Sequence, residues 1–341
     1  MRPLATAVSS AFRATTTRPA FCFTSKSASF GNARHFSTRP ERKGGSKILL
    51  ATLLGAGAVA GLTFNQSKTT VKPAVKEAVA EVKEKVHFTA PDFTPLKLIE
   101  VKHVSHNTKY YRFELPKDQT AGIPVASCVL ARYQAEGEEP VVRPYTPISS
   151  ADTVGFLEFV IKKYDTGKLT PILDSMKPGD TLEFKGPLPK YNWEKDQKTN
   201  VGLIAGGSGI TPMVQIIRRV LDEKPTDKKT KVTLIFANVN ENDILLKDEL
   251  DQIAKEHPDK VKIIYALDNP PEGWAGLKGY VTADAIKKYM PNPEDKDSII
   301  MVCGPPPMVA SLAGPKKGMK QGELGGILKE LGYAQENVFK F

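Results

Sequence analysis

Gly206-Gly-Ser-Gly-Ile-Thr-Pro-Met213 is the stretch of sequence that decides the fold of this chain. It follows the apolar run Val201–Ala205 and leads into a helical pattern over Met213–Asp222, so it predicts a strand, a glycine loop and a helix. Glycines let a backbone approach a phosphate closely, and Thr211 beside Pro212 begins a helix whose amino end favours an anion. We interpret the stretch as a nucleotide-binding loop, although a glycine loop alone is weak evidence.

The rest of the C-terminal part alternates strands with helices. Strands are predicted at Val232–Ala237, Val261–Leu267 and Ser298–Cys303, and helices at Leu246–Glu256, Thr282–Tyr289 and Leu324–Leu331. This alternation predicts a parallel sheet, in which ligands bind at the carboxyl ends of the strands. We therefore expect an α/β nucleotide-binding domain over residues 196–341.

Residues 90–195 have a different sequence pattern. Apolar and polar residues alternate in short runs, and turn residues separate the runs. Strands are predicted at Leu96–Val104, Lys109–Leu115, Ala126–Arg132, Gly155–Lys163 and Asp180–Lys185, with one helical stretch near Leu169–Ser175. Many short strands with a single helix predict a small antiparallel β-barrel. Glu194–Asn200 is expected to link it to the following domain.

A second motif, Arg143-Pro-Tyr-Thr-Pro-Ile-Ser149, lies inside the predicted barrel. Its two prolines hold the backbone extended while an arginine, a tyrosine and a threonine project in fixed relation. A guanidinium can bind a pyrophosphate with two hydrogen bonds, and an aromatic ring with a neighbouring hydroxyl can meet a flat, partly polar ring. Taken alone, the motif could equally be a turn with a surface ion pair.

A third motif, Cys303-Gly-Pro-Pro-Pro-Met308, ends a predicted strand in a rigid turn. In this order and spacing the three motifs resemble the ferredoxin-NADP reductase-like flavoprotein superfamily, most closely its NADH-cytochrome b5 reductase branch. The resemblance covers roughly residues 90–341, and three motifs in register are far more specific than one glycine loop. It implies an antiparallel β-barrel FAD domain followed by an α/β domain that binds NADH.

The resemblance also implies the site residues. It puts Arg143 at the FAD phosphates, and Thr211 and Cys303, the implied catalytic positions, beside the flavin and the nicotinamide. Because hydride passes directly between the two rings, Cys303 is expected to supply shape and polarity, not a nucleophile. The implied cofactor-binding residues are Arg143, Pro144, Tyr145, Thr146, Val160, Lys162, Tyr164, Gly167, Lys168, Leu169, Thr170, Gly206, Gly207, Thr211, Asp268, Cys303, Gly304, Pro305, Met308 and Phe341.

Several of these residues have structural alternatives. Thr170 could be an ordinary cap after a glycine turn, and Phe341 could belong to a frayed terminus. Asp268 could bond the ribose hydroxyls of NADH and repel the extra phosphate of NADPH, but a loop role is nearly as well supported. Cys128, in an apolar run, is expected to be a buried inert thiol. The basic insertion Gly314–Lys320 has no role that the sequence supplies.

The N-terminal part has the composition of a targeting and anchoring region. Residues 1–46 are rich in Arg, Ser and Thr and nearly free of acidic residues, as in a mitochondrial targeting segment. Residues 47–66 are expected to form one transmembrane anchor, because the twenty residues 48–67 carry no charge and can cross a hydrocarbon core of roughly 30 Å. A cleavable sorting signal is the alternative. Residues 67–89 are expected to form a tether.

Charge and cysteine content exclude two classes of protein. Residues 1–47 hold nine Lys or Arg against one Glu, so they supply +8 of the formal net charge of +10 and leave +2 for the remainder. Nucleic-acid binding is therefore not expected. The three cysteines are far apart with no metal-binding spacing, so no metal site is expected and electrons must travel on an organic cofactor.

These observations lead to one functional expectation. The chain is expected to be a reductase that uses FAD to pass electrons from NADH to cytochrome b5 or a similar haem protein. The alternatives are a reductase for another acceptor and a non-catalytic, membrane-tethered binding module. Family analogy gives a single-pass protein of the outer mitochondrial membrane, with a processed form in the intermembrane space as an additional possibility.

Overall fold

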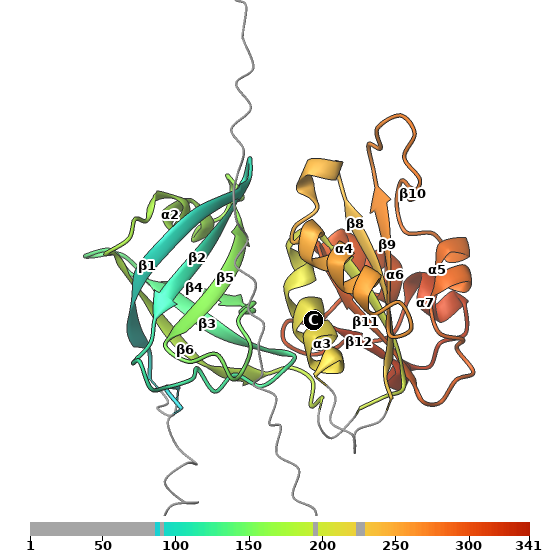
Figure 1. Cartoon of the computed structure of the whole chain (residues 1–341), viewed down its shortest axis with the longest axis horizontal. Helices are drawn as coiled ribbons and strands as arrows, with labels where there is room; N and C mark the ends of the chain where they lie inside the picture. The colour runs from blue at the N-terminus through green and yellow to red at the C-terminus, as the bar shows by residue number, and fades with distance from the viewer. Residues whose placement is uncertain (1–85, 89–91, 194–196, 223–228) are drawn as a thin grey trace, which may run out of the picture. The chain divides into compact units, whose positions relative to one another are not determined.

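The computed structural model describes residues 86–88, 92–193, 197–222 and 229–341, which belong to one compact unit. It contains an antiparallel sheet followed along the chain by a parallel sheet (Figure 1). The expected targeting segment, the expected anchor and most of the expected tether lie outside the described residues. Among the residues that are described, no helix is both long enough and apolar enough to cross a membrane.

The antiparallel sheet has six strands in the order β4-β3-β6-β1-β2-β5. Their bounds are β1 Thr94–Ser105, β2 Thr108–Glu114, β3 Ser127–Tyr133, β4 Val141–Tyr145, β5 Phe156–Lys162 and β6 Thr181–Pro189, with helix α2 at Thr170–Ser175. All five strands expected here are present. The sixth, β4, was not expected because Pro144 interrupts it. Proline is tolerated in an edge strand, and β4 is at the edge of the sheet.

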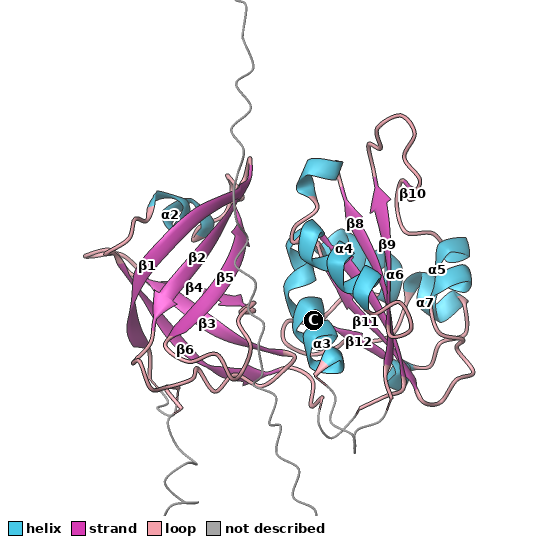
Figure 2. Ribbon diagram, viewed as in Figure 1, coloured by secondary structure: helices cyan, strands magenta, loops and turns pink. Residues whose placement is uncertain are grey.

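This sheet curls into a barrel (Figure 2), and its core contains several buried aromatic side chains. Phe159 in β5 and Phe184 in β6 stack with ring centroids 5.4 Å apart, although β1 and β2 separate their strands in the sheet. In a flat sheet, strands three positions apart lie about 14 Å from each other. The contact therefore requires the sheet to close over its own core.

Residues 86–88, at the end of the expected tether, pack on this barrel. Val86 pairs with Thr120, and the His87 backbone N–H donates to the Thr120 carbonyl at 2.8 Å. Phe88 is 5% exposed and belongs to the barrel core. Gly122 is required beneath this segment, since it has φ +65° and a Cβ there would lie 2.0 Å from Val86 Cγ1.

The parallel sheet also has six strands, in the order β10-β9-β8-β7-β11-β12. Its strands are β7 Asn200–Gly206, β8 Lys231–Asn238, β9 Val261–Leu267, β10 Leu277–Lys278, β11 Ser298–Cys303 and β12 Val338–Lys340. The helices are α3 Ile210–Leu221, α4 Lys247–Glu256, α5 Ala283–Tyr289, α6 Pro306–Ala313 and α7 Gly326–Glu330, with one-turn 3₁₀ helices η1 Gly207–Gly209, η2 Glu241–Asp243 and η3 Gln335–Asn337. Helix α6 and the short strands β10 and β12 were not expected.

Helices cover both faces of the parallel sheet. The core on one face includes residues of α3 and α4, and the core on the other face includes residues of α5, α6 and α7. Central strands buried on both faces read as continuous apolar runs, as in β7 and β11. The carboxyl ends of β7 and β11 lead into the two loops that the sequence singled out.

Candidate active site

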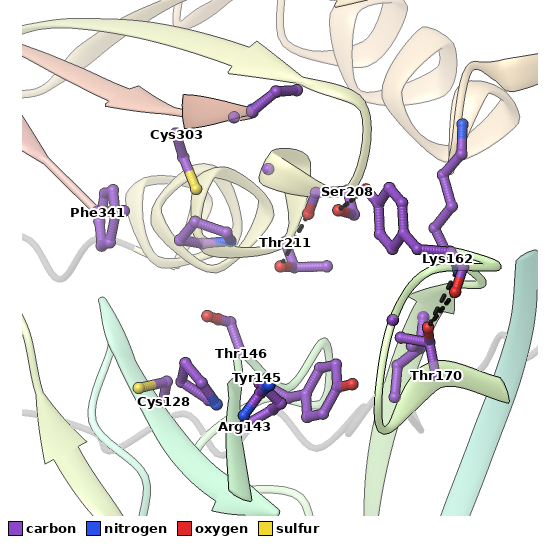
Figure 3. Close-up of a pocket in the computed structure, with 18 of the residues that line it drawn as sticks. Cys128, Arg143, Tyr145, Thr146, Lys162, Thr170, Ser208, Thr211, Cys303 and Phe341 are labelled. Carbon is purple, nitrogen blue, oxygen red and sulfur yellow. Dashed lines mark hydrogen bonds between the residues drawn. The ribbon is translucent and has the colours of Figure 1, made fainter. Parts of the chain in front are cut away.

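A pocket of about 640 Å³ is lined both by the end of the barrel that carries Arg143 and by the loops after β7 and β11 (Figure 3). All of the residues implied at the site line it except Gly206, Gly207, Asp268 and Met308. Thr146 and Thr211 lie on its opposite walls. Folding therefore brings the three sequence motifs around one cavity.

The barrel wall is built on the edge strand β4. Arg143 is exposed, and its Nη1 donates to the Val142 carbonyl at 2.7 Å. No described residue forms an ion pair with it. Tyr145 meets Phe159 edge to face at 6.4 Å, and burial raises the pKa of the Tyr145 phenol to about 12. The phenol therefore stays protonated at neutral pH, and Arg143 is a free cation at the pocket.

Strand β5 contributes Val160 and Lys162, and Tyr164 follows two residues after its end; the three side chains have different surroundings. Val160 is buried, and the Tyr164 hydroxyl lies 3.2 Å from Ser208 Oγ. Lys162 Nζ lies 3.2 Å from Asp243 Oδ1 of the α/β domain. Burial alone would raise the pKa of Asp243, but Lys162 and the hydrogen bonds from Asn240 hold it below its usual value. The charge of Lys162 is therefore balanced by protein.

The turn before α2 is closed by its own hydrogen bonds. Thr170 Oγ1 accepts from the Tyr164 backbone N–H and donates to the Tyr164 carbonyl, both at 3.1 Å. A Cβ at Gly167 would lie 2.5 Å from that hydroxyl, so the turn needs glycine there. Leu169 is 1% exposed. The Thr170 hydroxyl therefore bonds within this turn and does not cap α2, and Thr170 lines the pocket together with Gly167 and Lys168.

The α/β wall is made by two loops that fit closely together. A Cβ at Gly206 would lie 2.4 Å from Met308 Sδ, and a Cβ at Gly209 would lie 2.3 Å from the Cys303 carbonyl oxygen. Gly207 differs, since its φ is +52° and nothing lies within 4 Å of a Cβ there. The glycines at 206 and 209 are therefore needed for loop-to-loop packing, and only Gly207 is needed for its backbone conformation.

Thr211 and Cys303, the implied catalytic positions, both line this wall. Thr211 Oγ1 donates to the Ser208 carbonyl at 3.2 Å, in the first turn of α3. Burial raises the pKa of the Cys303 thiol to about 12, and Lys316 opposes this only in part. Cys303 is therefore a neutral thiol at physiological pH, which agrees with a role in shape and polarity and not in nucleophilic attack.

The chain terminus is ordered at this site. The Phe341 backbone N–H donates to the Val302 carbonyl at 3.0 Å, and its ring meets Phe339 edge to face at 5.0 Å. Its side chain lines the pocket beside Cys303 (Figure 3). The frayed terminus considered from the sequence is not what the structure has.

Of the four implied residues that do not line the pocket, Gly206 and Gly207 belong to the loop described above, and Asp268 and Met308 lie outside that loop. Asp268 is exposed just after β9, and its backbone N–H donates to the Asn238 carbonyl at 3.0 Å. It shares the carboxyl edge of the parallel sheet but lines none of the pocket. Met308, in α6, packs against the glycine loop from behind.

Sequence reasoning missed part of the pocket lining. Cys128 is a buried free thiol whose pKa is raised by burial, as expected, yet it borders the pocket. Lys190 and the insertion residues Lys316 and Met319 line it as well. Buried Lys340 holds the insertion in place, because its Nζ donates to the Ala313, Gly314, Pro315 and Glu323 carbonyls at 2.9 to 3.4 Å. Only tertiary structure brings these residues together.

Comparison with known proteins agrees with this two-part construction. Residues 95–193 match the oxidoreductase FAD-binding domain family, and residues 203–313 match the oxidoreductase NAD-binding domain family. The cytochrome b5 reductase domain of Ulva prolifera nitrate reductase superposes with a TM-score of 0.64 at 30% identity, covering 74% of this chain and 99% of that one. A ferredoxin NADP+ reductase from Neisseria gonorrhoeae shares the fold, with a TM-score of 0.58 at 19% identity over 74% of this chain and 98% of that one.

Whole-length relatives narrow the assignment. NADH-cytochrome b5 reductase 2 of Neurospora crassa is 44% identical over 328 residues, which cover 92% of this chain and 94% of the relative. NADH-cytochrome b5 reductase 2 of Emericella nidulans is 46% identical over 315 residues, covering 91% and 95%. Because identity at this level extends over almost the whole of both chains, the chain belongs to the NADH-cytochrome b5 reductase family.

Proposed function

We propose that this protein is an NADH-dependent flavoprotein reductase that passes electrons from NADH through FAD to cytochrome b5. The observation that carries the proposal is the single pocket that joins the Arg143–Ser149 motif to the Gly206 and Cys303 loops. One wall comes from the part of the chain that matches an FAD-binding domain and the other from the part that matches an NAD-binding domain. The pocket is therefore where the two redox groups can meet.

The residues present fit FAD. Arg143 is a cation at the pocket with no acidic partner among the described residues, as a pyrophosphate requires. Tyr145 and Thr146 offer a ring and a hydroxyl beside it, and Val160, Ile161 and Lys162 line the same cavity. We propose that Arg143 holds the phosphates and that Tyr145 and Thr146 hold the flavin ring.

Bound FAD would supply the redox chemistry of this site, which is uptake of a hydride from NADH and release of single electrons to a haem protein. The protein's part is placement. Thr211, fixed by its bond to the Ser208 carbonyl, and the neutral Cys303 thiol define the nicotinamide side of the pocket. Phe341, held by the Val302 carbonyl, closes it beside Cys303. These groups orient the reacting rings and keep water out without exchanging protons.

Purified protein tests the proposal directly. It should be yellow, it should be bleached by NADH without oxygen, and it should reduce cytochrome b5 faster than quinone or oxygenase partners. Bound FAD that NADH cannot bleach would support the non-catalytic binding module instead. Fast bleaching with faster transfer to another acceptor would retain the reductase and change its partner.

We also propose that residues 47–66 anchor the protein in the outer mitochondrial membrane, after a targeting segment at residues 1–46. The twenty uncharged residues 48–67 and the basic, acid-poor stretch before them support this. Import of a tagged chain into isolated mitochondria, followed by carbonate extraction and protease protection, tests it. A tagged product that carbonate releases in shortened form would indicate cleavage to a form in the intermembrane space.

A further inference from the structure

The first turns of helix α3 connect the two walls of the site. Thr211 faces the pocket, and Gln215 follows one helical turn later, so both lie on the same side of the helix. Gln215 is 9% exposed. Its Nε2 donates to the Pro147 carbonyl at 2.9 Å, and its Oε1 accepts from the Ala126 backbone N–H at 3.0 Å.

Both partners belong to the barrel segments that form the flavin side. Pro147 immediately follows Thr146. Ala126 precedes β3, the strand that pairs with β4 through Val129 and Tyr145. Ala126 also has the unusual φ of +59°, and its carbonyl accepts from the Lys190 and Tyr191 backbone N–H groups. One amide therefore ties the residue before β3 and the residue two positions after β4 to the helix that begins at the nucleotide loop.

The residue type suits this arrangement. A carboxamide offers a donor and an acceptor at once, and here each satisfies a buried backbone group that would otherwise lose its partner. Arg218, three residues further along α3, makes a parallel connection, because its Nη1 donates to the Ile148 carbonyl while its Nε and Nη2 pair with Glu249 of α4 at 2.8 Å. Behind Gln215 and Arg218 lies a second cavity of about 660 Å³, so on that side the contact is not backed by continuous packing.

We propose that Gln215 is a positioning residue for hydride transfer: its two hydrogen bonds set the separation between the flavin wall at Thr146 and the nicotinamide wall at Thr211. This rests on the proposed function. Hydride transfer needs the reacting atoms about 3–3.5 Å apart, and a displacement near 1 Å can cost about 100-fold in rate. A single amide that fixes both walls therefore controls the rate without touching either cofactor.

Two variants of the FAD-loaded, full-length protein test this. Gln215→Met keeps the length of the side chain and removes both hydrogen bonds. Gln215→Glu keeps the acceptor for Ala126 and loses the donor to Pro147 unless the carboxyl is protonated. Gln252→Met, at an exposed position of α4, is the matched control. The charged groups near Gln215 are Asp152, Arg218, Arg219, Asp222 and Glu249.

Anaerobic stopped-flow bleaching by NADH separates rate from binding. We expect the limiting rate to fall about 30- to 100-fold in Gln215→Met, with the apparent Kd for NADH changed less than about threefold and FAD retained. The primary isotope effect from NADH deuterated at C4 should rise, because hydride transfer becomes more fully rate-limiting. In Gln215→Glu the rate should recover as pH falls and the carboxyl regains its proton.

The opposite results would overturn the proposal. Limiting rates within threefold of the parent in both variants would remove Gln215 from the control of spacing. Rate losses that follow FAD release or lowered Tm, with no recovery of Gln215→Glu at low pH, would make its role structural only. A parent protein that NADH cannot bleach would refute the proposed function itself, which distinguishes the two failures.

Discussion

The two walls of the site are built by different means. The barrel wall presents long side chains, notably Arg143 and Tyr145, from an edge strand, and within the described ranges Arg143 has no acidic partner. The α/β wall presents a loop surface in which Gly206 and Gly209 fit against the Cys303 loop with no room for a Cβ. Charged and aromatic side chains that contact a ligand directly suit a cofactor that stays bound. A surface that recognises shape suits a nucleotide that binds and dissociates in each catalytic cycle.

The largest effect should come from removing the barrel-wall cation that we propose binds the FAD phosphates. Arg143→Ala removes the free cation, and each charge-assisted hydrogen bond is worth roughly 1.5–3 kcal/mol, so FAD affinity should fall about 10- to 100-fold for each bond lost. The purified variant should be colourless or release flavin on dilution. Arg132→Ala is the control, because Arg132 pairs with Glu183 on the same sheet and does not line the pocket. Equal flavin content in both variants would contradict the assignment.

The domains that carry the two walls also differ in which end of the chain contributes their outermost segment. The parallel sheet adds β12 from the chain's last residues, whereas the barrel recruits Val86–Phe88 from before β1. A protein that begins at Val86 should be fully stable, but one that begins at Thr89 loses buried Phe88 and should be about 3 kcal/mol less stable. Thermal unfolding should then occur roughly 6–12 °C lower. Matching Tm values would show that residues 86–88 only rest on the barrel.

A smaller effect is expected from disturbing the shape of the α/β wall. A Cβ in Gly209→Ala would lie 2.3 Å from the Cys303 carbonyl oxygen, so one loop must move, at a cost of about 1–3 kcal/mol. We expect kcat/KM for NADH to fall about 10-fold or more while FAD is retained. Gly207→Ala is the control for loop packing, since its Cβ meets nothing and only its φ of +52° resists the change. Similar losses in both would assign the effect to backbone conformation.

Most strands and helices of the two domains could be predicted from the sequence, but two of those near the site could not. Five barrel strands and the alternating C-terminal part follow from local periodicity. Strand β4 and helix α6 were missed because Pro144 and the prolines before Met308 look like interruptions, although an edge strand and a first helical turn both accept proline.

The sequence predicted which residues line the site better than it predicted the contacts that those residues make. Its motifs are contiguous, so local sequence could name most of the lining. The pairing of Lys162 with Asp243 and the contact of Gly209 with the Cys303 carbonyl cross long stretches of chain and depend on tertiary packing. The insertion carrying Lys316 is the clearest case, because Lys340, far along the chain, holds it at the pocket by bonds to the Gly314 and Pro315 carbonyls.

The smallest effect concerns nucleotide choice at a position outside the pocket. Asp268 is exposed at the carboxyl edge of the parallel sheet, the edge at which ligands bind in such sheets. A carboxylate there would accept hydrogen bonds from the free ribose hydroxyls of NADH and repel the phosphate that NADPH carries. Asp268→Thr should therefore weaken NADH and admit NADPH, shifting the ratio of their kcat/KM values about 10-fold, or 1.4 kcal/mol. Asp259→Thr, just before β9 and so at the amino-terminal edge of the sheet, changes the same charge at an exposed position and should leave the ratio unchanged. If both variants keep the parent's preference, Asp268 is a loop residue, and discrimination against NADPH must come from elsewhere on the α/β wall.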